Sequence, residues 1–252
     1  MGMLTLRHYA ILALALLITQ AGFWYMSADH LPNLGIVPEL SSKEELEMLS
    51  LGDHQLLFRI MAFRMNNTGD TFGRFSRLGD YDMEKIYHWF TLLDLFDNRS
   101  DHLAALSAYY FSQTQNEEDV TYLVDYLYEH SHTRPQEKWW WLAQATYLAM
   151  HKLEDHDRAL EIANHLKGVA DIPYWAQQMP AFVHEARGEE ESAMLIMLAI
   201  LREDDKLTQG ELNYIRYFME ERIKEQHEDV QRLLQQQQQR LDAQQDRLLQ
   251  SD

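Results

Sequence analysis

Residues 157–163 read Asp-Arg-Ala-Leu-Glu-Ile-Ala, and residues 191–197 read Glu-Ser-Ala-Met-Leu-Ile-Met. In each stretch a small residue, Ala159 or Ala193, opens an apolar helical face after a polar turn, and the two alanines are 34 positions apart. A repeat of this length is typical of helix-turn-helix units, which stack because one pair of helices cannot bury its apolar face alone. The spacing predicts a stack of helix pairs that offers a surface to another protein, and it disfavours an enzyme.

The composition supports a helical body and excludes several kinds of site. The chain has 252 residues, of which 46% are hydrophobic, so it can bury one substantial core. Leu, Ala, Met, Glu and Gln are abundant and favour helix. The chain contains no cysteine, which excludes disulfides, thiolate nucleophiles and cysteine-based metal centres. A net charge of −18 disfavours nucleic-acid binding and favours partners with neutral or basic surfaces.

An uncharged stretch covers residues 9–28, and its centre, residues 10–18, is continuously apolar. About 20 such residues span a bilayer as a helix. The aromatic residues 23–25 lie near its far end, where amphipathic rings prefer the membrane interface. We therefore predict that residues 1–28 form a cytoplasmic stub and a transmembrane anchor, with Arg7 on the cytoplasmic side. The alternative is a cleaved signal peptide, with Thr19 and Ala21 as the small residues of the cleavage site.

The rest of the chain divides into a linker, a helical domain and a tail. Residues 29–40 contain Pro32, Gly35 and Pro38 and are predicted to form an extended linker. Residues 41–226 are predicted to form the helical domain. Its first helix begins after Ser41 and Ser42, and further helices are expected near 54–65, 82–97, 101–114, 117–131, 135–152, 155–168, 173–187, 189–203 and 208–226.

The Gln-rich extension, residues 227–252, has leucines at 234, 241 and 248. The second seam that a strong coiled coil would need is mostly glutamine. The expectation is a solvated, partly helical extension, and the alternative is a weak oligomerising or docking helix.

The repeat resembles the tetratricopeptide repeat. Trp141, Ala145, Leu148 and Ala159 follow one another in the order of that family's pattern, and a second unit places Ala181, Gly188, Ala193 and Met197 at the family spacing. The resemblance covers roughly residues 54–203 and implies an α-hairpin solenoid of about four helix pairs with a C-terminal helix. A generic α-hairpin solenoid is the alternative. The layout also looks like bacterial membrane-anchored proteins of this repeat class, which implies an inner-membrane location with the helical domain in the periplasm.

In the resembled family, certain positions of the first helix of each pair line a concave surface. Transferred to this chain, these positions imply a partner-binding stripe of Trp139, Thr146, Trp175, Phe182, Glu185, His102 and Tyr109. Aromatic residues are frequent anchors at protein interfaces. The alternative is that these side chains are ordinary packing between repeats.

A second candidate contact site is the long loop Asn66–Asp80. It carries Arg74 and Arg77 in an otherwise acidic protein, with Phe72 and Phe75 beside them. Loops of this length in compact domains are often functional. Alternatively, the phenylalanines hold the loop against the first repeat and the arginines pair with nearby acids.

The sequence offers no metal, cofactor or catalytic motif. Of the 12 histidines, the closest pairs are His130 with His132 and His151 with His156, and neither spacing places both rings on one helical face. Glycine-rich phosphate loops and zinc-protease motifs are missing from the sequence. The expected function is a membrane-anchored scaffold or adaptor that binds a partner protein or peptide in the cell envelope. The alternative is a permanent structural subunit of a membrane complex, without a peptide groove.

Overall fold

The structure is a computed structural model that describes residues 6–27, 35–71, 74–203 and 207–222, together with 234–236, 238–240 and 242–243 of the tail. Its α-helices are α1 (Leu6–Ser27), α2 (Lys43–Ser50), α3 (His54–Asn66), α4 (Met83–Asp97), α5 (His102–Ala105), α6 (Glu117–Ser131), α7 (Pro135–His151), α8 (His156–Ala163), α9 (Tyr174–Gln177), α10 (Met179–Ala186), α11 (Glu190–Glu203) and α12 (Gln209–Tyr217). Single turns of other helix types are η1 (Leu78–Asp80), η2 (Leu106–Tyr110), η3 (Phe111–Gln113), η4 (Asn164–Leu166) and η5 (Phe218–Arg222). Strands β1 (Asp70–Thr71) and β2 (Arg74–Phe75) form a small antiparallel hairpin.

Polar side chains near the predicted helix starts cap several helices. Ser42 and Glu45 form a reciprocal capping box at α2, with bonds of 3.2 and 3.0 Å. Asp53, Asp82 and Asp155 each accept a bond from a backbone N–H in the first turn of α3, α4 and α8. Such caps satisfy amides that have no partner within the helix, and each contributes about 1 kcal/mol.

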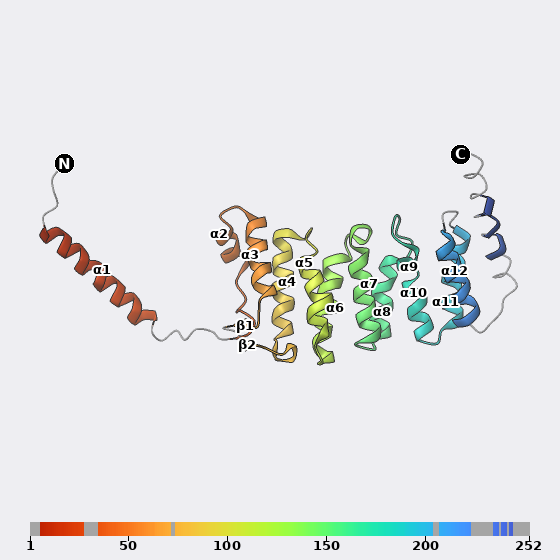
Figure 1. Ribbon diagram of the computed structural model, residues 1–252, viewed down its shortest axis with the longest axis horizontal. Coiled ribbons are helices and arrows are strands. Elements are labelled where there is room, and N and C mark those ends of the chain that lie inside the picture. The colour runs from red at the N-terminus through yellow and green to blue at the C-terminus, as the bar shows by residue number, and fades with distance from the viewer. Residues whose placement is uncertain are drawn as a thin grey trace.

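The helices from α2 to α12 form one elongated array (Figure 1). Helices near in sequence pack together in the pairs α3–α4, α4–α6, α6–α7, α7–α8, α8–α10 and α10–α11. The predicted all-α class and the solenoid-like stacking are therefore confirmed. Ala159 and Ala193 are both completely buried, as expected of small residues that let paired helices approach closely.

Two apolar clusters follow one another along the array. The first extends from Val37 to Val183 and the second from Ala181 to Leu234, and Phe182 packs against both. At this junction Arg187 bridges Asp157 of α8 and Glu189, each at 2.8 Å. Packing and ion pairs thus join the C-terminal helices to the rest of the stack.

Helix α1 lies apart from this array (Figure 1), and its described side chains from Ile11 to Met26 are exposed. Judged by length and hydropathy together, none of the helices in the described ranges qualifies as a membrane span. The anchor expected at residues 9–28 therefore stays a prediction.

The described end of the predicted linker is part of the folded body. Val37 is buried in the first cluster, the Trp89 indole donates to the Pro38 carbonyl at 3.0 Å, and Lys85 pairs with Glu39 at 3.1 Å. Residues 35–40 thus form neither helix nor strand, as predicted for a linker, but they pack on the body, because an apolar side chain at Val37 gains more from burial than from solvent.

The described tail residues are helical and contact α12. Leu234 is buried in the second cluster, and the Gln238 side chain exchanges two hydrogen bonds with Gln209, at 3.0 and 2.9 Å. This favours the docking alternative, with the chain's own α12 as the docking site. Leu241 and Leu248 lie outside the described residues.

Candidate functional site

Three successive tryptophans near the start of α7 point in different directions, because neighbouring helical residues are rotated by about 100°. Trp141 points into the core and donates its Nε1–H to Asp101 Oδ1 at 2.7 Å. Trp139 is half-buried against the same core. Trp140 is the most exposed of the three, with 38% of its surface accessible.

These tryptophans are the centre of an aromatic cluster, which we define as Tyr109, Trp139, Trp140, Trp141 and Trp175. Trp139 and Trp140 are edge-to-face at 5.5 Å, and Trp175 of α9 meets them edge-to-face at 5.4 and 5.9 Å. Tyr109 of η2 lies 6.0 Å from Trp141 and accepts a hydrogen bond from Trp140 Nε1 at 2.5 Å. Edge-to-face pairs at these distances are favourable in themselves, so the cluster holds its shape without a ligand.

A buried polar network lies directly before the tryptophans. Lys138 has non-helical backbone angles (φ −116°, ψ 20°) and kinks α7. Its ammonium donates to His130 Nε2 at 2.8 Å, to Asn98 Oδ1 at 2.9 Å and to the Asn98 carbonyl. On the other side of the His130 ring, Nδ1 lies 2.6 Å from Asp94 Oδ2. The network joins α4, α6 and α7, and it therefore fixes the position of the α7 backbone directly before Trp139.

The charge of Lys138 is disfavoured by this position. Desolvation is the largest cause and lowers the pKa of Lys138 to about 8, although Asp94 opposes the shift. His130 is buried and belongs to the same interior network. Within the described ranges no three side chains of ligand type come together as a metal site.

Phe182 and Glu185 lie apart from the aromatic cluster. They line a cavity of about 380 Å³ together with Tyr147 and Met150 of α7 and Tyr214 of α12. Phe182 is edge-to-face with Tyr214 at 5.9 Å and packs on Phe218 at 5.8 Å. Helix α12 thus covers the side chain that the repeat pattern places on an open surface.

Two other members of the predicted stripe differ from expectation. Thr146 is completely buried, and its hydroxyl donates to the Leu142 carbonyl at 2.9 Å, so it cannot contact a partner and its assignment was wrong. His102, at the start of α5, is exposed but lines a separate cavity beside Arg59 and Phe63 of α3. The structure therefore brings together Trp139, Trp175 and Tyr109 but not the whole stripe.

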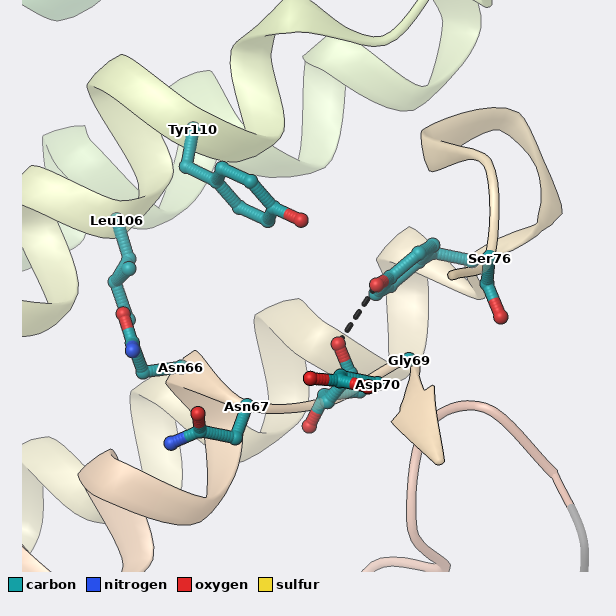
Figure 2. A pocket seen from close by; sticks show the side chains of 9 residues that line it. Asn66, Asn67, Gly69, Asp70, Ser76, Leu106 and Tyr110 are labelled. Carbon is teal, nitrogen blue, oxygen red and sulfur yellow. Dashed lines mark hydrogen bonds between the residues drawn. The ribbon is translucent and has the colours of Figure 1, made fainter. Parts of the chain in front are cut away.

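The long loop contains the β1–β2 hairpin and borders a cavity of about 410 Å³ (Figure 2). Tyr81 donates its hydroxyl to the Thr68 carbonyl at 2.7 Å, and burial, together with Tyr110 and Asp70, raises the pKa of Tyr81 to about 12. Arg77 is highly exposed and pairs with Asp80 at 3.4 Å. This local pair fits the alternative stated for the loop.

The remaining loop positions give no test of the second contact site. The backbones of Arg74 and Phe75 lie in β2, but their side chains lie outside the described residues, as does all of Phe72. A partner contact at Arg74 stays a prediction.

Sequence reasoning missed Trp140 and the tyrosines of α12. Successive helical residues are rotated by about 100°, so three adjacent tryptophans cannot all face the core, and the sequence therefore indicates that one of them is exposed. The position of α12 over Phe182 could not be predicted in this way, because it depends on contacts between residues far apart in sequence. Comparisons with family models, with curated proteins and with solved structures found no match for this chain.

Proposed function

We propose that this chain is a membrane-anchored helical-repeat scaffold or adaptor, and that its aromatic cluster binds a segment of a partner protein. The observation that carries the proposal is the exposure of Trp140 and Trp175, 38% and 37%, inside a cluster whose rings meet edge-to-face. Large rings that are held rigidly and half-exposed lose little entropy when a partner covers them.

The cluster also offers hydrogen bonds to a partner. The Tyr109 hydroxyl accepts from Trp140, and its own proton has no acceptor among the described residues. The Trp175 indole N–H likewise has no partner within the described ranges. An extended segment with a backbone carbonyl between two apolar side chains fits these donors. The net charge of −18 favours segments that are neutral or basic.

The membrane part of the proposal rests on α1. This helix has 22 residues, and its large apolar side chains, including Leu12, Leu14, Leu17 and Ile18, are all more than half exposed. Apolar side chains on every side of a helix that contacts no core need another apolar medium. The supporting observation is this exposure and not the length-and-hydropathy criterion, which α1 does not meet.

The repeat class and the orientation belong to the same proposal. The complete burial of Ala159 and Ala193 at the 34-residue spacing supports tetratricopeptide-type units. Arg7 before α1 supports a cytoplasmic N-terminus, with the array on the other side of a bacterial inner membrane. A permanent structural subunit remains the second candidate, since the exposed apolar side chains of α3 would suit a fixed assembly.

Photo-cross-linking in cells tests the two candidates. Benzoylphenylalanine replaces Trp140, or Leu195 of α11 as a matched exposed control. An adaptor gives one discrete protein adduct from position 140 and none from 195, and Trp175→Ala abolishes that adduct while circular dichroism stays unchanged. Adducts of similar yield from both positions that survive Trp175→Ala would favour the permanent subunit instead.

A further inference from the structure

Helix α3 has two apolar faces, although it packs on only one side. Leu57, Phe58, Met61, Ala62 and Met65 form its buried face. Leu56, Ile60 and Phe63 follow an i, i+4, i+7 spacing, which places them together on a second face, and they are 53%, 56% and 69% exposed. This exposed stripe lies at the N-terminal end of the array, where α2 and α3 begin the stack (Figure 1). None of the helices that the structure describes covers it.

The charges on α3 are opposite in sign to those of the whole protein. The helix carries Arg59 and Arg64 and has neither Asp nor Glu, whereas the chain has a net charge of −18. Neither arginine makes an ion pair with any residue that the structure describes. An exposed apolar stripe flanked by unpaired arginines is the pattern of a helix that lies in the interface of an anionic bilayer.

A cavity beside the stripe has the groups that hold a phosphate. It measures about 310 Å³ and is lined by Arg59, Ser100, His102 and Asn66, with Phe63 and Ala62 among its apolar walls. Arginine pairs with phosphate oxygens in a bidentate manner, and hydroxyl and amide groups donate to them. The cavity thus places hydrogen-bond donors for a phosphate next to an apolar surface. A phospholipid likewise has its phosphate headgroup next to its apolar chains.

The covalent path from α1 keeps this face near the anchor. Val37, which is buried in the core, is ten positions after Ser27, the last residue of α1. An extended chain of that length spans at most about 35 Å. If α1 spans a membrane, the N-terminal end of the array cannot move farther than this from the bilayer surface.

We propose that the outer face of α3, formed by Leu56, Ile60, Phe63, Arg59 and Arg64, docks on an anionic phospholipid surface. The inference rests on the membrane anchor proposed above and assigns a second, interfacial contact to the body. The contact orients the array relative to the bilayer and leaves the aromatic cluster of α7 and α9 for the partner. Attraction must be local, because the acidic body as a whole is repelled by anionic lipid.

Single-cysteine labelling tests the proposal in the 252-residue chain, which has no native cysteine. Ile60→Cys, Leu14→Cys of α1 and Leu195→Cys of α11 each carry an environment-sensitive fluorophore, and all three native side chains are exposed. The proteins are reconstituted into phosphatidylcholine vesicles with or without phosphatidylglycerol. With phosphatidylglycerol, the probe at 60 should give severalfold brighter, blue-shifted emission that lipid-borne spin labels quench. The probe at 195 should report water in both lipids.

The three positions separate failure of the inference from failure of the anchor. A lipid signal at 14 with a water signal at 60 overturns the α3 contact and leaves the anchor intact. Water signals at both 14 and 60 overturn the anchor itself. Burial of the probe at 60 without vesicles, increasing with protein concentration, identifies a second copy as the occupant and overturns the lipid proposal. A signal at 60 in cell membranes but not in protein-free vesicles identifies a protein occupant, with the same consequence.

A charge reversal tests the electrostatic part. Arg59→Glu with Arg64→Glu should abolish the lipid signal at position 60, while the signal at 14 and the circular dichroism spectrum stay unchanged. Lys167→Glu with Arg202→Glu, at two exposed positions farther along the array, is the matched control and should leave the signal at 60 intact. An unchanged signal at 60 in the double variant would overturn the proposed recognition of anionic lipid.

Discussion

Lys138 Nζ lies 2.8 Å from His130 Nε2, in the interior of the array and one residue before the first of the three tryptophans. Lysine has only donors at neutral pH, so His130 accepts at Nε2 and donates from Nδ1 to Asp94. The kink at Lys138 also lets its ammonium reach the Asn98 carbonyl, which ends α4. One buried lysine therefore joins α4 and α6 to the turn that presents the aromatic cluster.

Replacing this lysine should destabilise the whole array. Lys138→Met leaves buried His130 Nε2 without its donor and leaves the Asn98 oxygens with Arg134 alone, and removal of one partner of such a network costs about 3 kcal/mol. The unfolding midpoint in urea measures the loss. Lys167→Met, at an exposed position, is the control and should unfold with the wild type. Equal midpoints for Lys138→Met and the wild type would contradict a structural role for the network.

The same lysine should make stability rise with pH above neutrality. An unfolded lysine keeps its proton up to a pKa of about 10.4, whereas the pKa of Lys138 in the folded protein is lowered to about 8. Between these values the unfolded state binds more protons, so the free energy of unfolding increases with pH, by on the order of 1 kcal/mol per pH unit at most.

Urea unfolding of the wild type and of Lys138→Met isolates this effect. The measurements run from about pH 7.5 to about pH 9.5, because this range lies mostly between the folded and unfolded pKa values of the lysine. The difference in unfolding free energy between the two proteins should grow as pH rises. A difference that is constant over the window would mean that the folded lysine keeps its ordinary proton affinity.

Gly69 should be intolerant of any side chain. It has φ +87°, and a Cβ added there would lie 1.8 Å from the Tyr81 hydroxyl oxygen. Gly52 has φ +89° with open space around it, so Gly52→Ala loses only the conformational freedom of glycine, about 1–2 kcal/mol. Gly69→Ala should cost about 1–3 kcal/mol more than Gly52→Ala, because Tyr81 must also move and lose its bond to Thr68. Equal melting temperatures for the two variants would show that the loop relaxes freely.

The two alanines that define the repeat give a further test. Ala159→Trp and Ala193→Trp insert a large ring where the native residue is fully buried, and each should cost about 1–3 kcal/mol or more. Ala170→Trp, at an exposed position between η4 and α9, should have little effect. Thermal melting checks all three variants. If Ala159→Trp and Ala193→Trp melt with the wild type, close helix approach at these positions is not what holds the pairs together.

The starts of several helices could be predicted from sequence because they depend on local chemistry, whereas the predicted helices 101–114 and 173–187 are interrupted in the structure. Asp53, Asp82 and Asp155 lie at or next to the predicted helix starts at 54, 82 and 155, and each of these side chains caps a helix. The predicted helix 117–131 coincides with α6, since acidic residues begin it and the polar turn before Pro135 follows it. Caps and helix period act within a few residues of each other, so a single sequence contains them.

The surfaces could not be predicted in the same way. Leu56, Ile60 and Phe63 have the same helical period as the buried face of α3, and only the missing neighbour on one side leaves them exposed. Phe182 is covered by α12, which is about 30 residues further along the chain. Thr146 satisfies its hydroxyl within α7 and so can be buried despite its polarity. Each outcome depends on which helices meet in space, and the local sequence does not contain that information.

The tryptophans of the aromatic cluster should separate into two classes of stability effect. Trp141 is buried and bonded to Asp101, so Trp141→Ala should cost about 3–5 kcal/mol on unfolding, as expected for a large core residue. Trp140 and Trp175 are more than a third exposed and contact other rings mainly by their edges, so each truncation to Ala should cost only about 1 kcal/mol. Trp139, which is half-buried, should fall between these values.

This separation decides whether the cluster is a binding surface, because the adaptor proposal needs Trp140 and Trp175 to affect recognition more than folding. If they anchor a partner, truncation of either should weaken the free energy of partner binding by about 2 kcal/mol or more, and partner recovery should fall accordingly. The melting temperature should change little. Leu195→Ala, at an exposed position on α11 outside the aromatic cluster, is the control for recovery. Melting losses for Trp140→Ala and Trp175→Ala as large as that for Trp141→Ala would assign both rings to the core and leave the permanent structural subunit as the better reading.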